Sequence, residues 1–364
     1  MRFPEFSGEW SKDTLQNVVA FSNGKAHESC VDENGCYILV NSKFISTEGS
    51  VIKKATLQLS PLFKSQFVMV MSDLPNGKAL AKCFYIEEDN IYTLNQRICS
   101  FTTRNRNISR FLMYQINRNK YYLRYDDGIN QTNLKKGEVL ACPVFIPSIQ
   151  EQTKIATFIH LLDKRIATQN KIIEDLKKLK SAISKKLLCN DKWTTYKIQN
   201  IAEIGRGRVI SSVEIERQKH PLYPVYSSQT SNDGVMGYLD GYMFDGEYIT
   251  WTTDGANAGT VFYRKGKFNC TNVCGTLKIQ PNFDCYFVSL VLQQATQKYV
   301  SSNLANPKLM NNTMASIKIS MPNIEAQRQL SKMFQTLDSC LSVHKRTYKM
   351  YLKEKQYLLR QMFI

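Results

Sequence analysis

The stretch "IPSIQEQTKIATFIHLLDKRI", residues 146–166, has a close relative much later in the chain, "MPNIEAQRQLSKMFQTLDSCL", residues 321–341. The two align without a gap at an offset of 175 residues, from 146 to 321. A repetition at a fixed offset indicates that a structural unit occurs twice, and this decides the architecture. The identical positions include Pro147 and Pro322, Gln152 and Gln327, and Asp163 and Asp338.

The duplication extends into the segments before the two stretches. Residues 10–24 and 193–207 share the pattern W-x4-apolar-x2-apolar-x2-apolar-x2-G. Residues 128–147 align with residues 303–322, and the final prolines coincide. The parts in between diverge almost completely. The order along the chain is therefore module, helix, module, helix.

Each repeated stretch opens a long segment without Gly or Pro, whose apolar residues alternate at spacings of four and three. This spacing is the seam of a coiled coil. Polar residues interrupt the seam at Gln169 and Lys180, and at the matching His344 and Lys355, which suggests devices that fix the register. The alternative is two unrelated amphipathic helices, each packed on its own module. The main expected seam residues are Ile155, Ile159, Leu162, Ile166, Ile173 and Leu176 in the first helix, and Leu330, Phe334, Leu337, Leu341, Tyr348 and Tyr351 in the second.

The modules between the helices have a strand-rich pattern. Residues 37–45, 66–71, 247–251 and 260–268 are rich in β-branched and aromatic residues and are bounded by Asn, Gly and Asp, so they predict strands. One helix is expected late in each module, over the segments "SRFLMYQINRNKYYL" and "YFVSLVLQQATQKYV". The predicted fold class is α+β, with two homologous modules. The predicted boundaries are 1–147 and 191–321 for the modules, and 148–190 and 322–364 for the helices.

The composition favours a polyanionic partner. The chain has 364 residues, a formal net charge of +17 and a pI near 9.3, and this excess points most simply to nucleic acid. Residues 148–190 carry 9 basic against 4 acidic side chains, and residues 322–364 carry 8 against 3. These basic helices are either ordinary solvated faces or lie near phosphates or an acidic partner surface. Without a signal peptide or a membrane-length apolar run, the ten cysteines are expected to be reduced in a cytoplasmic protein.

Familiar catalytic motifs are missing from the sequence. It has no Walker lysine loop, "GRGRVI" lacks the third glycine of a dinucleotide fingerprint, and no Asn/Asp-Pro-Pro-aromatic loop of an amino methyltransferase is present. The nuclease-like motif Asp175-Leu-Lys177 falls on the expected coiled coil, where an exposed ion pair explains why these two charges occur together. Cys270 with Cys274, and Cys30 with Cys36, lack further ligands at zinc spacing. We expect a binding protein with no catalytic residue and no metal.

These residues resemble the specificity subunit of Type I restriction-modification systems, over essentially the whole chain. The resemblance rests on the helix start P-x4-Q-x2-I/L-x6-L-D at Pro147–Asp163 and Pro322–Asp338, on the beginning "RFPEFSGEW", and on the W-x4-L-x2-V opening of each module. It implies two target-recognition domains separated by two long helices that pack as an antiparallel coiled coil. The second half lacks the Gly and Gln of "GINQTNLKKG" (128–137), which leaves the contacts of that loop open.

The resemblance also implies partners and cofactors. Such a subunit selects a split, asymmetric site on double-stranded DNA and carries two modification subunits, which methylate adenine with S-adenosylmethionine, and a translocating restriction subunit joins in some systems. It binds no cofactor itself, so S-adenosylmethionine, ATP and Mg²⁺ would belong to the partner subunits. The alternatives are a self-contained restriction or modification enzyme with degenerate motifs, or a coiled-coil scaffold without a role on nucleic acid.

Candidate DNA contacts are the polar residues that suit base edges and phosphates. The coiled coil would fix the distance between the two readers, so that the base pairs it spans are not read. In the first module the candidates are Lys25, Lys43, Arg104, Arg106, Gln131 and Asn133. In the second they are Arg206, Arg208, Ser228, Gln229, Asn306 and Lys308.

Overall fold

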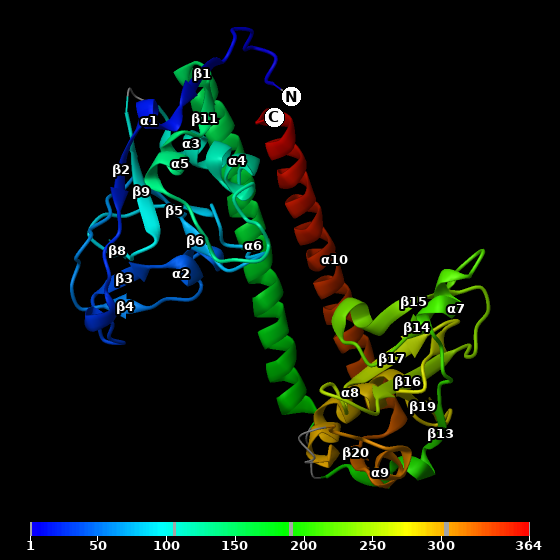
Figure 1. The fold of residues 1–364 in the computed structure, drawn as a ribbon. Helices are drawn as coiled ribbons and strands as arrows, with labels where there is room; N and C mark the ends of the chain where they lie inside the picture. Colours follow the sequence, from blue (N-terminus) through cyan, green and yellow to red (C-terminus); the bar gives the residue numbers. More distant parts are fainter. Residues whose placement is uncertain (1, 105–106, 189–191, 302–305, 364) are drawn as a thin grey trace. The chain divides into compact units, whose positions relative to one another are not determined.

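The computed structural model describes the chain except for residues 1, 105–106, 189–191, 302–305 and 364 (Figure 1). Packing divides it into two compact units. The first comprises Met1–Gln169 with Thr347–Ile364, and the second comprises Asn170–Arg346. Each of the two long helices contributes one stretch to each unit. The four-part division expected from the sequence remains a prediction. Below, module one denotes residues 1–147 and module two residues 191–321.

Module one has a four-stranded antiparallel sheet in the order β2-β9-β5-β7 and a three-stranded sheet in the order β4-β3-β8, in which β3 and β8 are parallel (Figure 1). Two short ladders, β1 with β11 and β10 with β6, complete it. Its strands are β1 (Ser11–Thr14), β2 (Val19–Asn23), β3 (Tyr37–Val40), β4 (Lys54–Ala55), β5 (Phe67–Val70), β6 (Ser72–Asp73), β7 (Cys83–Tyr85), β8 (Tyr92–Leu94), β9 (Ile98–Thr103), β10 (Thr132–Asn133) and β11 (Pro143–Ile146). Its helices are α1 (Leu15–Val18), α2 (Ser42–Ser46), α3 (Ser109–Ile116), α4 (Lys120–Leu123) and α5 (Lys136–Leu140).

Module two repeats this topology, except that an isolated bridge between Asp254 and Lys308 replaces the ladder of β6 with β10. Its sheets run β13-β19-β16-β17 and β15-β14-β18, with β14 and β18 parallel, and β12 pairs with β20 as β1 pairs with β11. Its strands are β12 (Thr194–Lys197), β13 (Ala202–Arg206), β14 (Tyr223–Tyr226), β15 (Val235–Leu239), β16 (Glu247–Thr252), β17 (Val261–Lys265), β18 (Asn269–Cys270), β19 (Cys274–Ile279) and β20 (Lys318–Met321). Its helices are α7 (Ser212–Glu216), α8 (Cys285–Ala295) and α9 (Asn311–Ser316). The shared strand order confirms that the modules are homologous, although their middles share almost no sequence.

The long helices are α6 (Ile149–Leu187) and α10 (Ile324–Met362). In the first unit, Leu358 and Met362 of α10 join the core around Ile155 and Ile159 of α6, together with Phe111 of α3. In the second unit, the end of α6 packs beside the start of α10, where Ile183 and Leu188 join the core around Phe334. The helices are therefore antiparallel within each unit, and every expected seam residue is buried or half-buried. Near the helix starts, the seam packs on the module as well as on the other helix.

The glutamine of the repeated motif ties each helix to its module. Gln152 is 1% exposed, its Nε2 donates to the Pro147 carbonyl at 3.0 Å, and its Oε1 accepts from the Ile108 backbone N–H at 3.0 Å. Gln327 makes the same two bonds, to the Pro322 carbonyl at 2.8 Å and from the Asp284 backbone N–H at 3.0 Å. The spacing P-x4-Q is needed because the side chain must fold back onto that proline while reaching the segment before α3 or α8.

The aspartate of the motif sits between the module and the opposite helix. Asp163 accepts a hydrogen bond of 2.7 Å from the Tyr114 hydroxyl and pairs with Lys355. Burial and the Asp163 charge together raise the pKa of Tyr114, so its hydroxyl remains a donor. Lys355 is one of the polar residues that interrupt the expected seam. The second unit repeats both contacts with Asp338, Tyr286 and Lys180.

Several local expectations are wrong in detail. The expected strand 37–45 ends at Val40, and α2 follows it, so Lys43 lies on a helix. The expected helix over residues 109–123 breaks into α3 and α4 around Arg118, which has a left-handed backbone with φ of 54°. In module two, α8 stops at Ala295 and a 3-10 turn, Thr296–Tyr299, follows. Each error lies where capping by Asn or a change of helix type replaces a continuous pattern.

Candidate nucleic-acid interface

The glycine that closes the W-x4 pattern marks one end of the large sheet in each module. A Cβ on Gly24 would lie 2.0 Å from the Asn95 carbonyl oxygen, and one on Gly207 would lie 2.2 Å from the Cys270 carbonyl oxygen. Only glycine lets these backbones approach so closely. The residues that follow, Lys25 and Arg208, form matching parallel bridges to Asn95 and Thr271. We call this end of the large sheet, with the loops that continue from its strands there, the loop end of each module.

In module two, the loop end centres on the turn between β16 and β17, residues 253–257. The Arg206 guanidinium donates to the Thr253 hydroxyl at 2.9 Å and lies 3.4 Å from the Asp254 carboxylate. Lys308 approaches the same carboxylate at 3.7 Å, and Asn306 accepts from the Gly255 backbone N–H at 3.1 Å. Two cations thus share one carboxylate, which leaves this corner positively charged.

In module one, neutral side chains make the equivalent bridge. Asn133 pairs with Ser72 across the β6–β10 ladder, as Lys308 bridges Asp254. The Asn133 amide oxygen accepts from the Ser72 hydroxyl at 2.6 Å, and Gln131 donates to that hydroxyl at 2.8 Å. The alignment of Leu134 with Leu309 fixes the equivalence of the two bridges. The Leu134 backbone N–H donates to the Met71 carbonyl, and the Leu309 backbone N–H donates to the Thr253 carbonyl. Each acceptor directly precedes the bridge residue, Ser72 or Asp254. Asn306 therefore occupies the place of Gln131, and it retains a hydrogen bond to the neighbouring loop although the glutamine is missing.

The remaining loop-end candidates also fall at matching positions. Val40 pairs with Leu94 as Tyr226 pairs with Cys270, so Lys43 and Gln229 are equivalent. Lys43 is exposed on α2, and Gln229 donates its side-chain amide to the Val235 carbonyl. Lys25 and Arg208 are also equivalent. Lys25 is exposed, whereas Arg208 pairs with Glu214. Ser228, at the place of Ser42, has its carbonyl bound by Asn257 at 3.2 Å.

Arg104 lies apart from this group. It follows β9 at the end of the sheet opposite the loop end, and its backbone N–H donates to the Val18 carbonyl at 2.7 Å. Its side chain is exposed. Arg106 lies outside the described residues. The other candidates of module one, Lys25, Lys43, Gln131 and Asn133, gather at the loop end.

The sequence reading missed the turn that organises module two's loop end. Thr253, Asp254 and Asn257 make the contacts to Arg206, Lys308 and Ser228 described above. A usable signal was present, because the run "TTDGAN" places Asp-Gly between two predicted strands, a typical turn signature.

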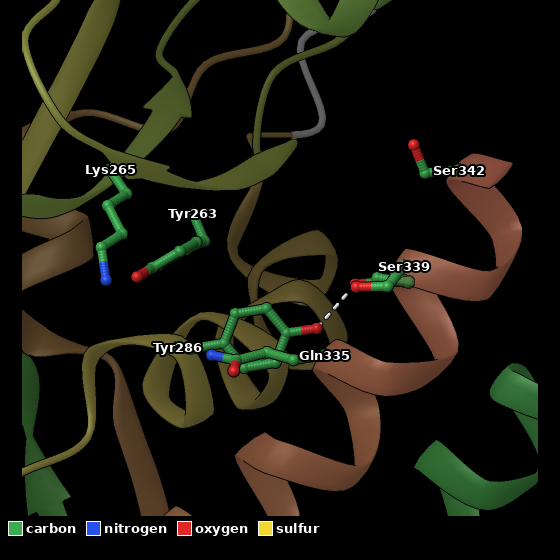
Figure 2. Close-up of a pocket in the computed structure, with 7 residues that line it drawn as sticks. Tyr263, Lys265, Tyr286, Gln335, Ser339 and Ser342 are labelled. Atoms are coloured by element: carbon green, nitrogen blue, oxygen red, sulfur yellow. Dashed lines mark hydrogen bonds between the residues drawn. The ribbon is translucent and has the colours of Figure 1, made fainter. Parts of the chain in front are cut away.

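A shallow hollow lies on the other side of module two, between β17, α8 and α10 (Figure 2). Tyr263 and Tyr286 form its wall, with small polar residues of α10 opposite. Its charged groups are already engaged, because Lys265 pairs with Glu247 and Asp338 accepts from Tyr286. The hollow is therefore a shallow groove between packed elements rather than a catalytic cleft.

Metal ligation and membrane insertion find no support in the described residues. Cys270 and Cys274 are buried free thiols, and burial raises the pKa of each. Within the described part of the chain, no three His, Cys, Asp or Glu side chains gather as a ligand set for a metal. None of the helices described is both long and apolar enough to cross a bilayer.

The family follows from the duplicated modules and helices. A family model, the Type I restriction modification DNA specificity domain, matches residues 7–178 and again residues 190–350. The chain belongs to this family. Each match covers one module with most of the helix that follows, as the repeat of the sequence predicts. The chain has the role of a DNA specificity subunit, and the predicted fold of two tandem α+β modules with long helices is confirmed.

Named relatives and solved structures agree with this assignment. The Mycoplasma pneumoniae protein S.MpnORF201P, named as a type I specificity subunit, is 38% identical over 192 residues, which are 52% of this chain and 80% of that protein. The specificity subunit of the M. pneumoniae enzyme MpnII is 43% identical over 143 residues, 39% of this chain and 43% of that protein. The crystal structure of an S subunit from M. genitalium has the same fold, with a TM-score of 0.74 at 16% identity, over 100% of this chain and 99% of that one.

Proposed function

We propose that this chain is the non-catalytic reading subunit of a type I restriction-modification enzyme, and that each module reads one half of a bipartite, asymmetric DNA site. The observation that carries the proposal is the pair of loop ends. Both modules present the same loops on the same strand framework, but with different side chains. Matching frameworks suit two equivalent docking geometries on duplex DNA, and unlike side chains suit two unlike half-sites.

The loop-end residues divide by the contacts they suit. Lys25, Lys43 and Lys308 present flexible cations suited to phosphates, whereas Gln131, Asn133, Ser228, Gln229 and Asn306 present groups suited to base edges. Arg206 and Arg208 suit a guanine edge as well as a phosphate. Arg104 would act from the other end of module one, on the flanking backbone, and Arg106, outside the described residues, remains a candidate from the sequence.

The partners belong to the same proposal. Modification subunits that methylate adenine with S-adenosylmethionine, and a restriction subunit that uses ATP and Mg²⁺, would bind this chain and supply the chemistry, in the cytoplasm. A structure concerned with complex assembly and conformational transition of the type I system has this fold, with a TM-score of 0.54 at 14% identity, over 99% of this chain and 98% of that one. The exposed basic faces of α6 and α10 are surfaces on which such partners could dock.

The decisive experiment is methylation-site sequencing of DNA from cells that express this chain with its modification subunits. A split motif with two unlike halves is the expected result. The purified chain alone, incubated with duplex DNA, Mg²⁺ and S-adenosylmethionine, should neither cleave nor methylate. Activity of the chain alone would favour a self-contained enzyme, and DNA binding by the complex without sequence dependence would favour a scaffold.

A further inference from the structure

The two modules differ in the layer between their large and small sheets. In module one, the large sheet turns Val68, Val70, Ile86 and Ile98 into an apolar cluster shared with Phe44. The strand registers place four different residues at the positions of Val68, Val70, Ile86 and Ile98 in module two. They are Thr250, Thr252, Arg264 and Cys274.

Arg264 is an unusual occupant of such a layer. The residue is 7% exposed, its Nε donates to the Thr250 hydroxyl at 3.2 Å, and its guanidinium carbon lies 3.5 Å from the centre of the Tyr226 ring. Among the described residues, no carboxylate lies within ion-pair distance of it. Burial lowers the pKa of Arg264, yet a guanidinium keeps its charge in proteins. Asp233 of the loop Ser227–Gly234 acts on this cation only from beyond ion-pair distance. A buried cation without an ion-pair partner costs stability that an apolar side chain would not cost.

The guanidinium lies beneath both ends of the loop Ser227–Gly234. Tyr226, on which it stacks, directly precedes this loop. At the other end, a Cβ on Gly234 would lie 3.1 Å from Arg264 Nη2. The Ser227 backbone N–H donates to the Gly234 carbonyl at 2.9 Å and closes the loop. Asn232, Asp233 and Gly234 all have left-handed backbones, with φ of 50°, 52° and 83°, so this loop needs support from its surroundings.

Module one supports the equivalent segment differently. There Lys43 belongs to α2, which Asn41 caps and which Phe44 and Ile45 anchor in the apolar cluster. The loop of module two has no such anchor, since the small apolar cluster nearby consists of Ile210, Val225 and Leu239 with Ile215 beside it. A planar cation stacked under the loop takes over that task.

We propose that Arg264 is a positioning residue that holds the loop Ser227–Gly234, with Ser228 and Gln229, in the conformation that reads module two's half-site. The inference rests on the proposed function, because it concerns how this loop end recognises DNA. Arg264 itself lies too deep to touch a base and acts through the loop.

The test is Arg264→Ile, which installs the side chain that module one has at this position, Ile86. The chain is assembled with its modification subunits, and a randomised duplex DNA library is methylated with S-adenosylmethionine and sequenced. We expect thermal stability to be unchanged or higher and discrimination at one half-site to fall at least about tenfold. That half-site should be the one that Arg206→Ala also alters, while the other half keeps its specificity. The matched control is Lys265→Ala, the next residue on β17, whose exposed side chain faces away and whose loss should leave both half-sites intact.

Arg264→Lys provides the second variant, because it keeps the buried charge but loses the planar stack on Tyr226. Partial loss at the same half-site is expected. A folded Arg264→Ile complex with unchanged discrimination would overturn the proposal, and so would unfolding of both variants, since Arg264 would then serve folding alone. If instead the wild-type complex showed no sequence preference, the proposed function itself would fail, whatever the variants do.

Discussion

At the start of α6, Gln152 binds the Pro147 carbonyl and the Ile108 backbone N–H, and at the start of α10, Gln327 binds their counterparts with distances that differ by no more than 0.2 Å. The layers between the sheets differ, by contrast. Module one has an apolar cluster there, whereas module two has a layer of threonines around a buried arginine. The frameworks that hold the modules onto the helices have stayed alike, and the parts that support the loop ends have diverged. A protein that must read two unlike half-sites from equivalent positions needs this division.

The largest effect is expected where the two helix starts differ. Glu151 is fully buried, and both its oxygens accept from Arg2, at 2.7 and 2.6 Å, whereas the matching residue of the second helix is Ala326. Arg2→Ala leaves a buried carboxylate without its cation and should cost about 2–3 kcal/mol, somewhat less than a fully buried pair because Arg2 is 31% exposed. Urea unfolding followed through the fluorescence of Trp10, which lies beside Glu151 at 3.3 Å, measures this cost.

The control for that experiment is Arg2→Ala with Glu151→Ala, which reproduces the alanine of the second helix. Removing both charges should recover most of the lost stability, since no buried charge then remains unpaired. If the double variant is as unstable as the single one, the N-terminal segment contributes through packing, and the ion pair is not the cause.

A smaller and symmetric effect is expected at the shared glutamines. Gln152→Leu and Gln327→Leu each leave a buried carbonyl and a buried N–H without a partner, at a cost of about 1–3 kcal/mol each. Gln152→Leu should lower the unfolding free energy slightly more than Gln327→Leu, because the Gln152 amide also donates to the Asn107 side-chain oxygen at 3.1 Å. The fluorescence of Trp10 reports on the first unit, and that of Trp193 and Trp251 on the second. Costs that differ widely between the two variants would show that the helix starts are not equivalent.

Much of this framework could be predicted from the sequence, whereas the loop-support layer could not. The offset of 175 residues made Gln152 and Gln327, and Asp163 and Asp338, visible as pairs, because helical packing restricts the same positions twice. The strand 260–268 was also predicted, but alternation alone assigns Arg264 to the solvent face, because charged residues rarely point inward. Arg264 is buried because the neighbouring sheet covers it, and two strands of that sheet, β14 and β15, come from a separate part of the chain.

The ion pairs between the helices should contribute less than the glutamines. Asp163 pairs with Lys355 and Asp338 pairs with Lys180, and all four side chains are partly exposed. Lys355→Asp should cost about 1 kcal/mol, and Asp163→Lys should cost more, because the Tyr114 hydroxyl also loses its acceptor. The double reversal should restore the part of the loss that comes from charge. A double-mutant cycle in urea measures the coupling. No recovery in the double variant would mean that packing of the seam, rather than charge, fixes the antiparallel register.

The smallest effect on stability, and the sharpest on DNA, concerns the two loop ends. Lys308 and Asn133 occupy equivalent bridges, but only Lys308 is charged, and its contact with Asp254 is long and half-exposed. Lys308→Ala should change the unfolding free energy by less than about 0.5 kcal/mol. If Lys308 contacts a phosphate, binding of the assembled complex to its site should weaken alike for all sequences, and the slope of log K against log salt should shrink by about one.

Asn133→Ala supplies the matched comparison in module one. A neutral amide at this place cannot release a counterion, so the salt slope should stay the same, and discrimination at a single base pair should relax instead. The two substitutions therefore separate a phosphate contact from a base contact at structurally equivalent positions. Equal changes of slope for both variants would contradict this division of roles, because they would mean that the neutral Asn133 and the charged Lys308 meet the DNA in the same way.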